Sequence, residues 1–227
     1  MDLAAHYQQL FKQSAKAILN HNYKLDLTID DATDSRYGIT LLIRPPEAVK
    51  NKIQSFLDQL KKVDDTQYFY PNSDIHITVL SIISCYEGFH LNQIEIEKYK
   101  TIINKHLPLL SNLEIDFNGI TAPDSAVMIQ GFPSNDSLNN FRNTLRDAFK
   151  NSPLEQSIDS RYTLFTAHST VCRFRKPIAD TAKFISILEK YRQQNFGTFT
   201  VNEVELVCND WYQRKEKTQI LHSFFLK

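Results

Sequence analysis

Cysteine is scarce in this chain of 227 residues, and its thiols are scattered. Cys85, Cys172 and Cys208 are too few and too far apart in the sequence for a disulfide framework or a Cys-x-x-Cys metal site. The sequence therefore predicts reduced thiols, as expected of a cytoplasmic protein.

An excess of charge of either sign is also missing. Lys plus Arg and Asp plus Glu both number 26, which leaves a formal net charge of zero. Proteins that coat long nucleic acid neutralise many phosphates with basic side chains, so this balance argues against that class. The balance remains compatible with a small nucleotide, or the end of an RNA strand, held in a locally basic cleft.

Long apolar segments are absent as well. No run approaches the roughly 20 apolar residues that a membrane span requires. Residues 1–10 are polar and lack the apolar segment of a signal peptide. We therefore expect a cytoplasmic protein that does not enter a membrane. The apolar fraction of 42% and charged fraction of 23% are those of an ordinary globular protein.

What the chain does contain is a regular alternation of helical and strand-like patterns. Helices are expected where apolar residues recur at helical spacing, over residues 2–20, 49–60, 92–106, 138–149 and a segment opened by Pro177. Ser134 or Asp136 is the expected cap of the 138–149 helix. Strands are expected over residues 37–43, 67–70, 75–83, 113–120, 126–132, 161–175, 199–208 and 219–226, with Gly197 as a boundary.

This order of elements favours an α+β fold. Strands occur in adjacent pairs as well as between helices, which fits mixed or antiparallel sheets better than a doubly wound parallel sheet. Each half of the chain also contains a strand–helix–strand unit. This faint duplication predicts two similar lobes that face each other across a cleft.

The strongest chemical signal is a pair of His-x-Thr motifs on apolar strands, His76-Ile77-Thr78 and His168-Ser169-Thr170. Side chains at i and i+2 leave the same face of a strand. Each motif therefore presents an imidazole that transfers protons near neutral pH beside a hydroxyl that donates to a phosphate oxygen. Two such motifs from opposite lobes would enclose one phosphorus, with a base at the entering oxygen and an acid at the leaving oxygen. Such a site requires neither a metal nor another cofactor.

These residues carry a resemblance to a known family. His76-Ile77-Thr78-Val79 and the run from His168 to Arg173 resemble the paired motifs of the two-histidine (2H) phosphoesterase superfamily, in its 2′-5′ RNA ligase-like and cyclic phosphodiesterase branch. The resemblance implies a bilobal α+β fold with a central cleft. It also implies hydrolysis or transesterification of 2′,3′-cyclic phosphates, 1″,2″-cyclic phosphates or 2′-5′ phosphodiesters.

The resemblance extends to individual residues. It implies that His76 and His168 are the catalytic acid and base, and that Thr78 and Thr170 bind the phosphate. Arg173 matches the arginine that commonly follows the second motif in the family, so it is a further candidate phosphate ligand. A carboxylate partner on the sheet is an equally open interpretation of Arg173.

The remaining expectations concern organisation and alternatives. Residues 1–35 are interpreted as an N-terminal helical extension, and residues 36–227 as a two-lobed phosphoesterase domain. We expect a monomer that acts on a small nucleotide or an RNA-terminal phosphate. One alternative is a catalytically inactive nucleotide- or RNA-binding protein of the same fold. Another is a metallohydrolase that uses His76 and His168 as ligands, which is disfavoured because no carboxylate stands at a suitable spacing.

Overall fold

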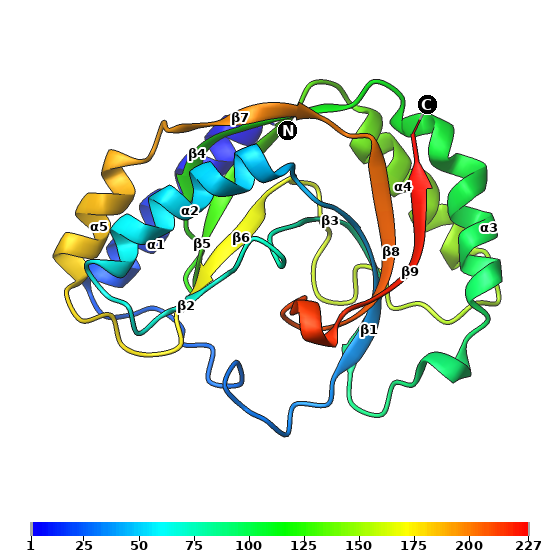
Figure 1. Cartoon of the computed structure of the whole chain (residues 1–227), viewed down its shortest axis with the longest axis horizontal. Coiled ribbons are helices and arrows are strands. Elements are labelled where there is room, and N and C mark those ends of the chain that lie inside the picture. The colour runs from blue at the N-terminus through cyan, green and yellow to red at the C-terminus, as the bar shows by residue number, and fades with distance from the viewer. Residues whose placement is uncertain (1, 227) are drawn as a thin grey trace.

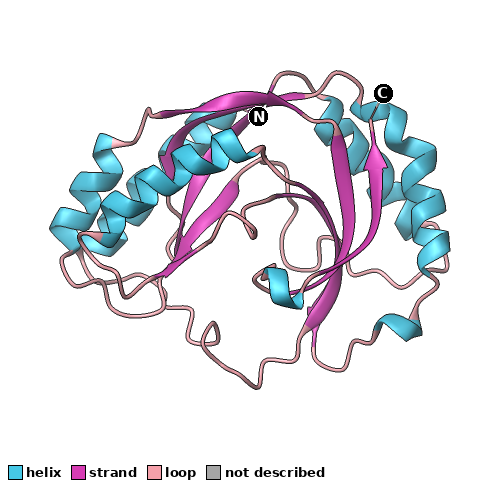
Figure 2. Cartoon of the chain, in the orientation of Figure 1, coloured by secondary structure: helices cyan, strands magenta, loops and turns pink. Residues whose placement is uncertain are grey.

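Two antiparallel sheets form the centre of the molecule in the computed structural model, which describes residues 2–226 (Figures 1 and 2). Sheet A has the strand order β3 (Ile77–Tyr86), β1 (Tyr37–Ile43), β8 (Glu203–Asp210) and β9 (Gln219–Phe225). Sheet B has the order β2 (Tyr68–Phe69), β6 (Ser169–Arg173), β5 (Ala126–Pro133), β4 (Glu114–Thr121) and β7 (Asn195–Thr200).

Helices pack beside each sheet and complete two lobes (Figure 1). Sheet A is flanked by α3 (Ile96–His106) and α4 (Ser137–Lys150), and sheet B by α1 (Leu3–Leu19), α2 (Glu47–Lys61) and α5 (Thr181–Lys190). Short 3₁₀ helices are η1 (Leu91–Gln93), η2 (Leu107–Leu110) and η3 (Lys215–Lys217). The expected two-lobed α+β architecture is confirmed.

The lobes do not correspond to halves of the sequence. Helix α4 packs against β3 of sheet A, although the strands on either side of it in the chain, β5 and β6, belong to sheet B. Likewise, β1 and β3 lie in sheet A while α2 between them packs on β6 and β7 of sheet B. Each lobe is therefore assembled from both halves of the chain, and this interleaving places the two His-x-Thr motifs in different sheets.

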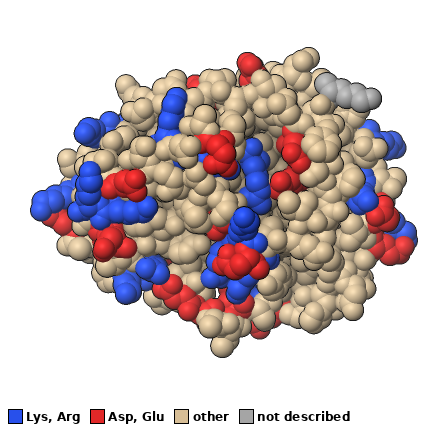
Figure 3. All heavy atoms as spheres, viewed as in Figure 1, with Lys and Arg blue, Asp and Glu red and all other residues tan. Residues whose placement is uncertain are grey.

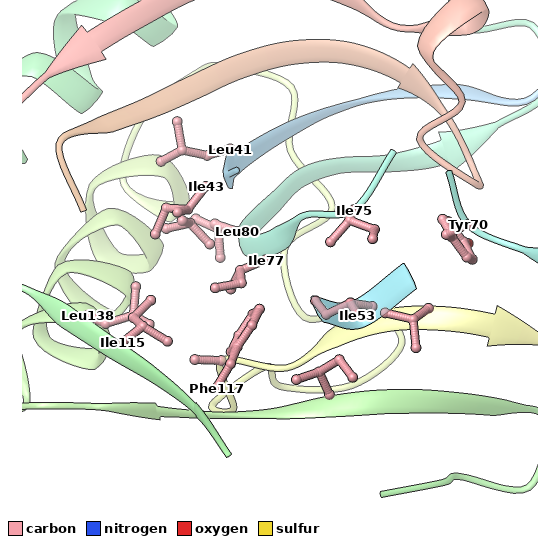
Figure 4. Packing of buried hydrophobic residues seen from close by; sticks show 14 of the residues in the cluster. Leu41, Ile43, Ile53, Tyr70, Ile75, Ile77, Leu80, Ile115, Phe117 and Leu138 are labelled. Carbon is pink, nitrogen blue, oxygen red and sulfur yellow. The ribbon is translucent and has the colours of Figure 1, made fainter. Parts of the chain in front are cut away.

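A continuous hydrophobic cluster joins the lobes. It includes Ile77 of β3 and Phe117 of β4, which come from different sheets (Figure 4). Helix α1 takes part in the packing, because Phe11 and Ile18 on its inner face are buried in the same cluster. The proposed boundary between an extension and a phosphoesterase domain at residue 35 stays a prediction, but the helix itself is part of the packed structure.

Two expected strands differ from the structure near the second motif and at the end of sheet B. The expected strand over residues 161–175 is reduced to Ser169–Arg173, because the carbonyl groups of Leu164 and Thr166 accept hydrogen bonds from arginines of α4 instead of from a neighbouring strand. The expected strand over residues 199–208 is divided between β7 and β8, which belong to different sheets. Gly197 is not a boundary but lies inside β7, with a φ of 121°.

One expected helix start is wrong, and one expected N-cap is present without its side-chain hydrogen bond. The last helix begins at Thr181 rather than at Pro177, since the side chain of Asp180 accepts a hydrogen bond from the Lys183 amide and caps it there. Asp136 is the N-cap residue of α4, as one of the two expected candidates, but its side chain makes no capping hydrogen bond. Ser134 instead accepts from the Glu114 amide, and Asn135 Oδ1 accepts from the Ser137 amide.

The charged side chains on the surface agree with the balance of acidic and basic residues, and the helices agree with the lack of long apolar segments. Basic and acidic side chains are interspersed on the face shown in Figure 3. In the described part of the chain, no helix combines the length and the apolarity needed to cross a bilayer.

Candidate active site

Both His-x-Thr motifs open into one cleft. His76 and Thr78 reach it from the start of β3 in sheet A, and His168 and Thr170 reach it from the start of β6 in sheet B. Arg173, at the end of β6, lines the same cleft. The structure therefore brings all five candidate residues together, in the arrangement that the two-lobe hypothesis requires.

The backbone fixes the orientation of the first imidazole. Nδ1 of His76 lies 2.7 Å from the carbonyl oxygen of Asp74. A carbonyl oxygen only accepts hydrogen bonds, so Nδ1 carries a proton and donates it to Asp74. In the neutral ring, Nε2 is consequently the free acceptor nitrogen.

The second imidazole has a side-chain partner instead. Nδ1 of His168 lies 2.6 Å from the hydroxyl oxygen of Thr166. A hydroxyl both donates and accepts, so this contact positions the ring without fixing its tautomer. The segment before His168 also approaches β5 closely, because a Cβ at Gly131 would lie 1.9 Å from the carbonyl oxygen of Ala167.

Burial keeps both imidazoles neutral at physiological pH. Desolvation lowers the pKa of His76 to about 4, against the opposing effect of its hydrogen bond to the Asp74 carbonyl. Desolvation likewise lowers the pKa of His168 to about 4, reinforced by the nearby positive charge of Arg142. Uptake of a proton by either ring thus requires a compensating negative charge, which a bound phosphate group supplies.

Arg173 has partners within the protein. Its Nε donates to the Tyr70 hydroxyl at 2.8 Å, and its Nη1 donates to Asp26 Oδ2 at 3.2 Å. The guanidinium also lies 5.4 Å from the ring centre of Tyr212. Arg173 is therefore paired with a carboxylate, although Asp26 lies in the loop before β1 and not on the sheet as expected, and the assignment of Arg173 as a phosphate ligand stays a prediction.

A buried arginine that the sequence analysis missed ties the two motifs together. Arg142 of α4 is 0% exposed, and its Nη2 donates to the carbonyl oxygens of Thr78 at 2.7 Å and Thr166 at 2.9 Å. Its Nε donates to the Val79 carbonyl oxygen at 2.8 Å. One guanidinium thus links the first His-x-Thr strand to the segment that carries His168. Its signal in the sequence was a charged residue on the apolar face of a helix, one turn from both Leu138 and Leu145.

Further residues that the sequence did not single out line the far part of the cleft. Ser81 and Ser84 lie on β3, Arg161 and Tyr162 on the loop between α4 and β6, and Trp211 after β8. Loop residues such as Arg161 carry no periodic pattern, so sequence alone offered no signal for them.

No metal-binding cluster accompanies these groups in the described residues. Nowhere in residues 2–226 do three or more His, Cys, Asp or Glu side chains gather in a position to hold a metal ion. The alternative of a metallohydrolase built on His76 and His168 receives no support from the arrangement.

A two-lobed antiparallel α+β fold, with one His-x-Thr motif from each sheet in a shared cleft, defines the two-histidine phosphoesterase type of protein. Residues 39–220 match the family model of the AKAP7 2′5′ RNA ligase-like domain, and the chain belongs to this family, in the LigT-like branch of the 2H superfamily. Membership supports a phosphoesterase-type function. No curated protein sequence matches the chain significantly.

Solved structures agree on the fold. TT0787 of Thermus thermophilus is 14% identical with a TM-score of 0.58, and the match covers 83% of this chain and 97% of that one. E. coli LigT complexed with 3′-AMP is 14% identical with a TM-score of 0.52, over 85% and 99% of the two chains. ATU0111 from Agrobacterium tumefaciens, a conserved protein of unknown function, is 14% identical with a TM-score of 0.56, over 93% and 97%.

Proposed function

We propose that this protein is a metal-independent phosphoesterase that opens a cyclic phosphate, or cleaves a 2′-5′ phosphodiester, of a small or terminal ribonucleotide. The observation that carries the proposal is that His76 and His168, from opposite sheets, line one cleft together with Thr78 and Thr170. The E. coli LigT structure with 3′-AMP supports a ribonucleotide as the ligand class.

The environments of the two histidines support a division of roles in the opening of a 2′,3′-cyclic phosphate. Nearby cations oppose protonation of both rings, Arg44 and Arg173 at His76 and Arg142 at His168, but His76 alone donates Nδ1–H to a backbone carbonyl, that of Asp74, which stabilises its protonated ring. We therefore assign the shared proton to His76 as general acid, and the neutral acceptor role to His168 as general base.

The reaction then balances without a further reactant. His168 takes a proton from water as the water oxygen forms a bond to phosphorus, and His76 gives its proton to the ribose oxygen as that P–O bond breaks. Thr78 and Thr170 donate to the non-bridging oxygens, and the guanidinium of Arg173 offsets their negative charge. The product is an open phosphomonoester, and the proton now on His168 returns to solvent or to His76.

The test is hydrolysis of the four nucleoside 2′,3′-cyclic monophosphates in excess EDTA by wild type, His76→Ala and His168→Ala. His106→Ala, on α3 outside the cleft, is the matched control. We expect turnover that survives EDTA, persists in the control and falls by about 10³-fold or more in both cleft variants. Turnover lost in EDTA would refute metal independence. Nucleotide binding without turnover would favour the catalytically inactive binding protein.

A further inference from the structure

The cleft follows strand β3 for most of its length. Thr78 stands near one end of the strand and Cys85 seven residues further along, and both line the cleft. At about 3.3 Å per residue, these two positions are about 23 Å apart. In the proposed function the reacting phosphate lies at the end with the histidines, so the rest of the cleft has room for more of a ligand.

The segment that leads to the second motif, residues 161–168, is tied to both ends of β3. At one end, Nη2 of Arg161 donates to the Cys85 carbonyl oxygen at 3.2 Å. At the other end, the buried arginine of α4 joins the carbonyl oxygens of Thr166 and Thr78. The cleft is therefore a groove bounded by β3 and by this segment, and not only a pocket around the histidines.

A row of hydroxyl groups follows the groove. Thr78, Ser81 and Ser84 are half-buried positions of β3 whose neighbours in the strand are buried, and all three line the cleft. Their spacing of three residues in place of two follows from the register shifts between β1 and β3. Hydroxyls donate to phosphate and sugar oxygens without selecting a base, so the row offers partners to a nucleic-acid backbone along β3.

Arg161 supplies a positive charge at the far end of the groove. Its guanidinium carbon lies 4.0 Å from the ring centre of Trp211. Stacking on an indole holds the guanidinium plane but leaves the N–H groups along its edge for an oxyanion. The neighbouring Tyr162 also lines the cleft and is 66% exposed. A cation beside an exposed aromatic ring is the combination that binds single-stranded nucleic acid, because every base has a face that stacks.

The other charged groups that line the cleft are paired within the protein. Arg173 is paired with Asp26, and Asp159 is paired with Arg146. Among the described residues, Arg161 lines the cleft without any carboxylate within ion-pair distance. An anionic chain that follows the groove therefore meets one uncompensated cation, at the end remote from the histidines.

A chain of several nucleotides is needed to span this distance. Six covalent bonds join successive phosphorus atoms of an RNA strand, so neighbouring phosphates of an extended strand lie about 6–7 Å apart. The phosphates that flank a single nucleotide therefore do not reach from the histidines to Arg161. About three or four such steps cover about 23 Å, and an RNA end of about four or five nucleotides provides them through its internal linkages.

We propose that the cleft is a groove for the 3′ end of a single RNA strand, in which Arg161 binds the third or fourth phosphate upstream of the reacting one. This inference rests on the proposed function, which places the terminal cyclic phosphate between His76 and His168. The preferred substrate is accordingly the end of an RNA strand of at least about four or five nucleotides, and not a free nucleotide.

The experiment measures kcat/KM for oligoadenylates of one to six nucleotides, each with a 5′-hydroxyl and a terminal 2′,3′-cyclic phosphate. In the wild type, we expect a rise of about tenfold or more between three and five nucleotides, the effect of one hydrogen bond between charged groups. Arg161→Gln should reduce the ratio of five to three nucleotides to about one. Equal kcat/KM at all lengths, a rise complete at three nucleotides, or a rise that survives Arg161→Gln would overturn the inference.

Neutral linkages identify the phosphate that Arg161 binds. Each linkage of the pentanucleotide is replaced in turn by an uncharged methylphosphonate. In the wild type, the third or fourth linkage from the cyclic phosphate should be the sensitive one, and Arg161→Gln should not respond to its replacement. Arg175→Gln removes a partly exposed arginine that is paired with Asp30 outside the cleft, and this control should respond as the wild type does. Equal sensitivity in Arg161→Gln and the wild type would refute the contact.

A binding measurement separates this inference from the proposed function. If no chain turns over, fluorescence anisotropy compares oligoadenylate 3′-phosphates of three and five nucleotides. Tighter binding of the longer chain, lost in Arg161→Gln together with about 0.7 in the slope of log Kd against log salt, would support the groove even though the phosphoesterase proposal failed. Equal affinities would refute the groove, and turnover that is independent of length would refute it while the proposed function stands.

Discussion

Replacing Arg142 should damage stability and catalysis together. Arg142→Met leaves the buried carbonyl groups of Thr78, Val79 and Thr166 without their donor. Each lost partner costs about 1–3 kcal/mol. Part of this is offset because burial of the charge is itself unfavourable, as the lowering of the Arg142 pKa to about 9 indicates. The expected net loss is about 3–5 kcal/mol of unfolding free energy.

The catalytic effect follows from position, since Arg142 touches the backbone of one motif and the segment leading to the other. A displacement of about 1 Å between reacting groups costs about 100-fold in rate. We therefore expect kcat for a 2′,3′-cyclic nucleotide to fall by about 100-fold, measured well below the unfolding midpoint. Arg142→Lys, which keeps the charge but not the planar fork, should restore only part of it.

Arg146→Met is the matched control for Arg142→Met. Arg146 lies one turn further along α4 and is also largely buried, but its contacts are with Asp159, Asn143 and the Leu164 carbonyl oxygen. The Arg146→Met variant should lose about as much unfolding free energy as Arg142→Met, with a much smaller fall in kcat. If folded Arg142→Met keeps kcat within about threefold of the wild type, or if both variants lose kcat equally, the positioning argument is refuted.

Three further predictions test the site and the fold. Because burial lowers the pKa of His76 and of His168 to about 4, the form with one protonated ring becomes rarer above that pH, and kcat/KM should fall as the pH rises from 5 to 8. Stability should fall as the pH drops from 6.5 towards 4, because the unfolded chain binds more protons there than the folded protein. Flat pH profiles of kcat/KM and of the unfolding midpoint would contradict these two expectations. Thr78→Ala and Thr170→Ala should each lower kcat by about 10- to 100-fold in steady-state assays, and Ser at either position should restore the rate. A Ser variant as slow as the Ala variant would exclude a role for the threonine hydroxyl in binding the phosphate. Phe11→Ala should destabilise the whole protein by about 3–5 kcal/mol in denaturant unfolding, whereas an unchanged main transition would mean that α1 unfolds independently.

Local patterns were enough to predict most elements and the pairing of the motifs. Strand β1 has the bounds expected from its apolar run, and the alternation from Ile75 to Val79 placed His76 and Thr78 on one face. The alternation was less regular at Ile82 and Ile83, and both are buried. The register between β1 and β3 shifts at several points, so a simple period of two does not extend along β3. This irregularity is why Ser81 and Ser84 both line the cleft, which periodicity did not predict.

Long-range contacts account for what the sequence did not reveal. The segment before His168 has a strand-like composition, yet it forms no strand ladder because Arg142 and Arg146 bind its carbonyl groups from a helix. Such contacts depend on how α4 packs beside β3, and no local propensity encodes that packing. The same reason applies to Arg161, whose position is fixed by a carbonyl on β3 and an indole after β8.

The N-terminal segment links these observations to specificity. Asp26 lies before residues 39–220, which match the family model, yet it pairs with Arg173, which lines the same cleft as His76 and His168. This pairing reduces the net positive charge at the reacting phosphate and holds the guanidinium in one orientation. The near end of the cleft thus depends on a residue outside the matched range for the position of its arginine.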